Sequence, residues 1–176
     1  GTVVGTSTAP TLTFSNTGAI AFTGSGARTL TLGGSTISDN TFRPQIIDGG
    51  GATTLSKVDG GLWLIDPASG NTYSGGTSIT GGTLAIQAGN ALGSGTITIN
   101  GGAGTGLQLR SVGTLANNIT NSTAEGGMHV LSGTNSLTGT VAVNANFRLA
   151  VDAGASVEFS NATAALSGAG SFIKFG

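Results

Sequence analysis

Short stretches in which apolar and polar residues alternate recur along the chain, about every 7 to 12 residues. Segments such as TLAIQ, TITIN, GLQLR and TVAVN are separated by Gly, Asn, Ser and Thr. The alternation is typical of β-strands with one buried face, and the residues between the segments are typical of turns. The sequence therefore predicts an all-β protein.

A longer period separates the possible β architectures. One column of comparable apolar residues has separations of 22, 23, 21 and 21, and a second column has separations of 20, 20 and 22. A sandwich has no reason to keep such a period, whereas a β-solenoid with one coil per period does. We therefore predict stacked coils of about 22 residues. The columns are Leu62, Leu84, Leu107, Met128 and Leu149, and Ile79, Ile99, Ile119 and Val141.

The alternation also predicts which side chains form the core. Trp63 lies between Leu62 and Leu64, so it should point outward if its two neighbours point inward. Tyr73 is expected to pack across a corner of a coil, with ligand contact as the alternative. The predicted core residues are Leu62, Leu64, Ile79, Leu84, Ile86, Ile97, Ile99, Leu107, Leu109, Ile119, Met128, Val130, Val141 and Leu149.

The composition argues against several classes of function. Charged residues make up 7% of the chain and the net charge is -1, without a basic cluster, so binding to nucleic acid is not expected. There is no cysteine, which excludes a disulfide framework and a thiolate metal site. No apolar run reaches the roughly 18 residues of a membrane helix, so membrane insertion of this segment is not expected.

The polar residues form no recognisable catalytic constellation. Asp48 and Asp66 are 18 residues apart, and most acidic residues occupy turn sequences, where Asp is common. His129 is expected to be outward and solvated, and a single histidine does not make a metal site. We therefore expect no enzyme activity, no catalytic or metal-binding residues and no cofactor.

Thr-x-Thr pairs raise one further surface hypothesis. A flat array of such pairs is what an ice-binding solenoid requires, in the same position of many consecutive coils. The pairs here fall in scattered coils, which predicts ordinary outward strand residues. They are Thr11/Thr13, Thr29/Thr31 and Thr96/Thr98.

Three motifs between residues 57 and 102 carry a family resemblance. Lys57 is followed by GGLWL, then by NTYSGGTSITGGTL (71–84), and then by ALGSGTITINGG (91–102). With these motifs the stretch resembles the autotransporter-associated β-strand repeat, also called the passenger-associated transport repeat. The sequence IDPAS (65–69) departs from the shorter segment usual in that family, which predicts a small protruding loop.

The resemblance implies a right-handed parallel β-helix within a long exported protein. It also implies a location at the outer surface of a Gram-negative cell, commonly in the passenger of a type V secretion system. Residues 1–176 are read as one β-solenoid segment of a longer or self-stacking protein. A second copy of the unit is predicted near residue 170, because the sequence around Lys174 resembles that around Lys57, 117 residues earlier.

The leading hypothesis is a structural, non-enzymatic segment, and two versions of it stay open. The segment is either part of the stalk of an autotransporter-type surface protein or a subunit of an extracellular filament or sheath. In both versions its partner is a coil of the same kind, either stacked end to end or continuing in the same chain as tandem repeats. Other surface polymers are further possible partners. The alternative hypothesis is an adhesin that binds surface or glycan ligands through Trp63, Tyr73 and the loop containing Asp66.

Overall fold

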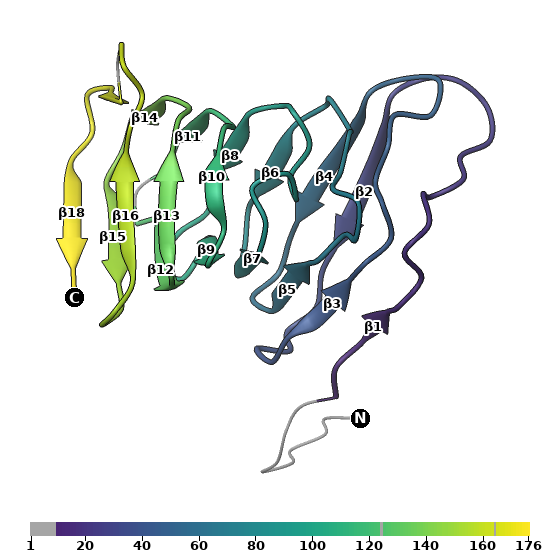
Figure 1. Ribbon diagram of the computed structural model, residues 1–176, viewed down its shortest axis with the longest axis horizontal. Helices are drawn as coiled ribbons and strands as arrows, with labels where there is room; N and C mark the ends of the chain where they lie inside the picture. The colour runs from purple at the N-terminus through teal and green to yellow at the C-terminus, as the bar shows by residue number, and fades with distance from the viewer. Residues whose placement is uncertain (1–9, 124, 164) are drawn as a thin grey trace.

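The computed structural model describes residues 10–176, apart from residues 124 and 164. These residues contain strands and no helix, and they form a β-solenoid of about seven coils. Figure 1 shows the coils stacked along one axis, with the chain running from purple at one end to yellow at the other. No helix that could span a membrane occurs in this described part of the chain.

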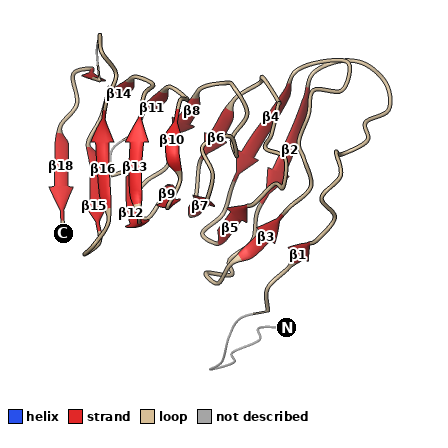
Figure 2. Cartoon of the chain, in the orientation of Figure 1, coloured by secondary structure: helices blue, strands red, loops and turns tan. Residues whose placement is uncertain are grey.

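The strands form three parallel sheets that run along the stack (Figure 2). The eight-stranded sheet contains β1 (Thr13–Phe14), β3 (Asn40–Phe42), β5 (Leu62–Ile65), β7 (Thr83–Ile86), β9 (Gly106–Arg110), β12 (Gly127–Ser132), β15 (Phe147–Val151) and β18 (Phe172–Phe175). The seven-stranded sheet contains β2 (Arg28–Leu32), β4 (Thr53–Lys57), β6 (Thr77–Ile79), β8 (Ile97–Ile99), β11 (Ile119–Asn121), β14 (Val141–Val143) and β17 (Leu166–Ser167). The three-stranded sheet contains β10 (Gly113–Leu115), β13 (Thr134–Leu137) and β16 (Ser156–Phe159).

The strand register confirms the predicted coil length of about 22 residues. In the eight-stranded sheet Trp63 pairs with Leu84, Leu84 with Leu107, Leu107 with Met128, and Met128 with Leu149. Each coil thus adds one strand to this sheet. Parallel pairing lets each coil satisfy the backbone groups of the next, and the apolar side chains fill the interior.

Trp63 points into the core, so the prediction that it faces outward is wrong. Its side chain is 5% exposed, and its Nε1 donates a hydrogen bond to the carbonyl oxygen of Gly33 at 2.8 Å. Leu62 is half-buried, and Leu64 is buried but lies outside the main core cluster. All four residues of LWLI are apolar, so the sequence pattern alone does not determine which pair faces inward.

The remaining residues expected in the core all lie in the buried cluster, but one pairing differs from the expected column. Ile79 pairs with Ile99, whereas Ile119 pairs with Ile97 and Val141 pairs with Ile119. The coil between Ile97 and Ile119 therefore spans 22 residues. The buried residues of that prediction are Ile79, Leu84, Ile86, Ile97, Ile99, Leu107, Leu109, Ile119, Met128, Val130, Val141 and Leu149.

The two similar lysine segments occupy different sheets. Lys57 lies in β4 of the seven-stranded sheet, and Lys174 lies in β18 of the eight-stranded sheet. In each segment the ammonium group donates to the carbonyl oxygen two residues further on, at Asp59 and Gly176. The likeness is therefore one of local conformation and not of position in the coil.

Replacement of Trp63 by Ala tests the orientation of β5. We expect Trp63→Ala to lower the free energy of unfolding by about 3–5 kcal/mol, because it leaves a cavity in the core. The neighbouring variant Leu62→Ala should cost about 1 kcal/mol, since that side chain is only partly buried. Urea unfolding followed by circular dichroism measures both, and equal costs would contradict this orientation.

Candidate functional site

Buried asparagines add side-chain contacts between coils, from the connection between β5 and β6 at Asn71 and from within β13 at Asn135. Asn71 accepts a hydrogen bond from the backbone N–H of Ile46 at 2.7 Å and donates to the carbonyl oxygen of Ala91 at 2.6 Å. One amide thus links the coil before it to the coil after it. Asn135 does the same, accepting from Val112 N–H and donating to Ser156 O. These amides satisfy backbone groups that would otherwise be buried without partners.

Lys57 is fully buried and holds one of these turns together. Its Nζ donates to the carbonyl oxygens of Val58, Asp59 and Gly81, at 2.7, 2.8 and 2.8 Å. Burial lowers the pKa of Lys57 to about 8, while the nearby charge of Asp59 acts in the opposite direction. The group is therefore an ammonium at neutral pH, and its three N–H donors match three acceptors, two in its own turn and one in the next coil.

Of the three residues expected to contact a ligand, only Asp66 is at the surface. Tyr73 is fully buried, and its hydroxyl lies 2.6 Å from Thr77 Oγ1. Burial raises the pKa of Tyr73 far above its ordinary value. Asp66 forms an exposed ion pair with Arg43 at 3.4 Å. Because Trp63 is also buried, these residues do not form a shared contact surface.

The carboxylate of Asp48 is engaged within the fold. Asp48 accepts hydrogen bonds from the backbone N–H of Thr53 and from both the hydroxyl and the N–H of Ser74. These bonds, led by that from the Ser74 hydroxyl, hold the pKa of Asp48 below its ordinary value. Asp48 thus joins two coils.

Among the described residues, no group of three or more His, Asp or Glu side chains could hold a metal ion.

A trough crosses the outer face of the eight-stranded sheet. Its volume is about 420 Å³. Thr83, Gly106, Gly127 and Arg148 lie side by side in register, so two positions of the row have no side chain. We call this hollow the outer trough. Its remaining lining residues are Gly104, Thr105, Leu107, Gln108, Glu125, Met128, His129, Ala150 and Phe175.

Gly106 and Gly127, the two glycines of this row, are required by the close approach of neighbouring coils. A Cβ atom on Gly106 would lie 2.5 Å from the carbonyl oxygen of Gly127. A Cβ atom on Gly127 would lie 1.9 Å from the carbonyl oxygen of Arg148. Both distances are far below van der Waals contact, so no other residue fits there without moving the backbone. The hollow is therefore built into the coil stacking.

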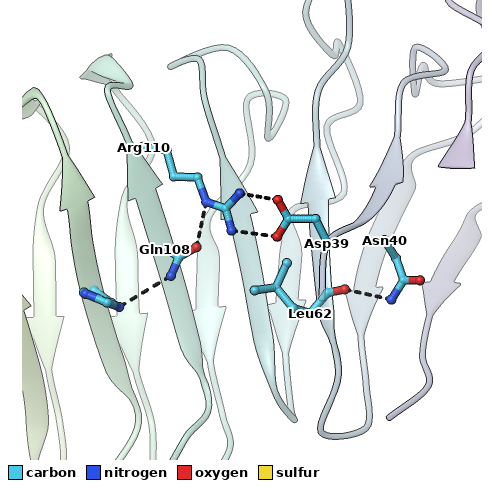
Figure 3. Close-up of polar contacts among 6 residues, drawn as sticks. Asp39, Asn40, Leu62, Gln108 and Arg110 are labelled. Atoms are coloured by element: carbon cyan, nitrogen blue, oxygen red, sulfur yellow. Dashed lines mark hydrogen bonds and ion pairs between the residues drawn. The ribbon is translucent and has the colours of Figure 1, made fainter. Parts of the chain in front are cut away.

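Five side chains are linked by hydrogen bonds along one side of the outer trough, and two of them, Gln108 and His129, line the trough itself. Arg110 donates to both carboxylate oxygens of Asp39, at 2.6 and 2.9 Å, and its Nε donates to Gln108 Oε1 at 2.7 Å (Figure 3). The Gln108 amide in turn lies 3.4 Å from His129 Nδ1, and His129 Nε2 lies 2.8 Å from Asp152. The tautomer with hydrogen on Nε2 satisfies both histidine contacts. The bidentate contact with Arg110 holds the pKa of Asp39 below its ordinary value.

The expectation for His129 is therefore only partly fulfilled by the geometry. The side chain faces outward and is half-exposed, as the alternation predicts, but it is paired with a carboxylate one coil further on. The opposite side of the trough carries Glu125 in an ion pair with Arg148. The Arg148 guanidinium also lies over the ring of Phe175, 5.0 Å from its centre.

The outer trough itself was not recognised from the sequence. Gln108, Glu125, Arg148 and Phe175 come from four different coils, and no local motif joins them. A weak signal exists, because GLQLR and GMHVL both place a glycine one residue before the inward Leu or Met. Alignment of the coils at a spacing of 21 residues would have put Gly106 next to Gly127.

Hydroxyl side chains form a continuous column on the outer face of the seven-stranded sheet. Thr31, Ser56, Ser78, Thr98 and Thr120 are paired in succession through five strands. The Thr-x-Thr pairs contribute only Thr31 and Thr98 to this column, so the pairs themselves still fall in scattered coils. Coils of unequal length hide the column in the sequence, and Gly76 and Asn118 in the adjacent column keep the array incomplete.

Comparisons with known proteins give one curated relative. No family model matches the chain, and no solved structure matches it. The sequence is 42% identical over 90 residues to the adhesin BmaC autotransporter of Brucella suis biovar 1 (strain 1330). The alignment covers 46% of this chain and 3% of that much longer protein. Together with the β-solenoid fold, this match agrees with the resemblance to autotransporter passenger repeats.

Removal of the Lys57 ammonium tests its role between the coils. We expect Lys57→Met to lower the free energy of unfolding by about 3 kcal/mol, because a buried acceptor without a partner costs about 1–3 kcal/mol. The matched variant Lys174→Met should have little effect, since Lys174 is exposed. Thermal unfolding of both variants measures the difference, and a neutral Lys57→Met variant would contradict this role.

Proposed function

We propose that this chain is a structural segment of an autotransporter-type protein on the outer surface of a bacterium. It would extend the protein away from the cell and would not act as an enzyme. The stack of parallel coils is the observation that carries this proposal, because such a stack can be lengthened coil by coil without a new core. The 90-residue match to an autotransporter adhesin supports the surface location.

A second role, adhesion, is favoured by the name of that relative and by the outer trough. The relative is called an adhesin, and the trough offers polar and aromatic side chains on an accessible face. Trp63 and Tyr73 do not offer an adhesive contact, since both side chains are buried. The loop containing Asp66 remains accessible as a further contact.

Surface display tests the structural proposal. The chain is fused behind an export signal and ahead of an autotransporter translocator in a Gram-negative host, and intact cells are treated with proteinase K. We expect the wild-type segment to reach the surface and to resist digestion as a folded unit. Leu84→Asp should be digested, because it places an unpaired charge in the core.

Two results of the display experiment would contradict the structural proposal. The first is retention of the wild-type segment inside the cell, when the translocator alone reaches the surface. The second is equal digestion of the wild type and Leu84→Asp, which would show that no stable stack forms at the surface. A variant on the outer face, Thr98→Ala, serves as the control and should behave as the wild type.

Self-association by end-to-end stacking is a further proposal, and it underlies the filament version. Phe14 is exposed in the first strand of the eight-stranded sheet, and Phe172 is exposed in its last strand. Apolar rings on the end strands of the described stack favour contact with a further coil.

A charge at one end of the stack tests this self-association. Light scattering should show concentration-dependent growth of the wild type and a monomeric Phe172→Glu variant, since the new carboxylate would have to be buried in the contact. A wild type that stays monomeric at millimolar concentration would remove the filament version.

A further inference from the structure

We propose that the outer trough binds a short, uncharged oligosaccharide, and this inference rests on the adhesive role proposed above. Four properties of the trough carry it: its shape, the fixed polar groups of its walls, its charge balance and its exposed aromatic ring. None of these depends on the residues first expected to contact a ligand.

The shape of the trough suits a small elongated ligand. The row from Thr83 through Gly106 and Gly127 to Arg148 crosses four neighbouring strands, about 14 Å at a strand spacing of about 4.8 Å. Its volume of about 420 Å³ lies within the range of small-molecule sites. The bare backbone of the two glycines lets a flat ring approach the sheet closely.

The polar side chains of the trough are already held in place, Gln108 and His129 by partners outside it and Arg148 by Glu125 within it. Arg110 fixes the amide of Gln108, Asp152 fixes the imidazole of His129, and Glu125 fixes the guanidinium of Arg148. A ligand therefore meets planar groups whose orientation costs little additional entropy. Arg148 keeps further N–H donors and Glu125 a second carboxylate oxygen, which suit the hydroxyl groups of a sugar.

The charge balance argues against an anionic ligand. Arg148 is paired with Glu125, and His129 is paired with Asp152, so each basic group has an acidic neighbour. A phosphate or sulfate group would meet these carboxylates as well as the cation. The trough has no unpaired basic cluster of the kind that binds polyanions. An uncharged ligand with many hydroxyl groups is the better match.

An extended peptide is also a poorer match than a sugar. Peptides commonly bind sheets by adding a strand at an open edge. The trough lies on the face of the sheet, where β9 and β12 are hydrogen-bonded to neighbours on both sides. Phe175 instead offers a 42% exposed ring at the end of the trough, where the apolar C–H face of a pyranose could pack.

An array of immobilised neutral and anionic oligosaccharides tests the proposal. We expect the wild type to bind neutral di- to tetrasaccharides, and titration calorimetry with the best of them gives the affinity. His129→Ala and Phe175→Ala should each weaken binding about tenfold, the effect of losing one good contact. Thr98→Ala, on the outer face of the other large sheet, is the matched control and should bind as the wild type. Unchanged thermal midpoints show that the variants are folded.

Three outcomes would overturn the proposal. These are no binding of any neutral saccharide by the wild type, binding of anionic saccharides alone, and unchanged affinity in both trough variants. If one variant fails to fold, Glu125→Gln replaces it, because it keeps the shape of the side chain and removes the charge. A segment that is displayed and protease-resistant but binds no saccharide leaves the structural role intact and removes only the trough ligand.

Discussion

The parallel pairing of each coil with the next is the interaction on which the rest of the structure depends. It satisfies the backbone of strands that are only two to six residues long and too short to be stable alone. Asn71, Asn135 and Lys57 add side-chain hydrogen bonds to the backbone of neighbouring coils. Loss of one buried polar side chain therefore removes hydrogen-bond partners from the coils on both sides. Single residues of this kind are for this reason important for the stability of the fold.

That pairing also shapes the surface. Because the coils lie in register, equivalent outward residues form rows along the stack, and one row contains Gly106 and Gly127 next to Arg148. The two glycines leave this outward row without side chains in two adjacent strands, and this gap forms the outer trough. A binding surface can thus arise from small changes within a repeated coil, without any change to the core beneath it.

The errors in the sequence predictions have a common physical origin. LWLI is apolar at four consecutive positions, so its alternation does not say whether Leu62 or Trp63 faces inward. In the structure Trp63, and not Leu62, pairs with the buried Leu84, so the indole ring lies in the core. The sequence column placed Ile119 beside Ile99, but the structure pairs Ile119 with Ile97. The turns differ in length from coil to coil, and the alternation within strands does not show these differences.

The sequence by itself determined the all-β class, the coil of about 22 residues and most of the buried side chains. It could do so because alternation and turn residues are local properties, and because a constant period has few structural explanations. Only the tertiary structure decided which residues meet on the surface. The register between coils brings together Gln108, His129 and Arg148. That register depends on the length of every turn, and the alternation within strands carries no information about turn length.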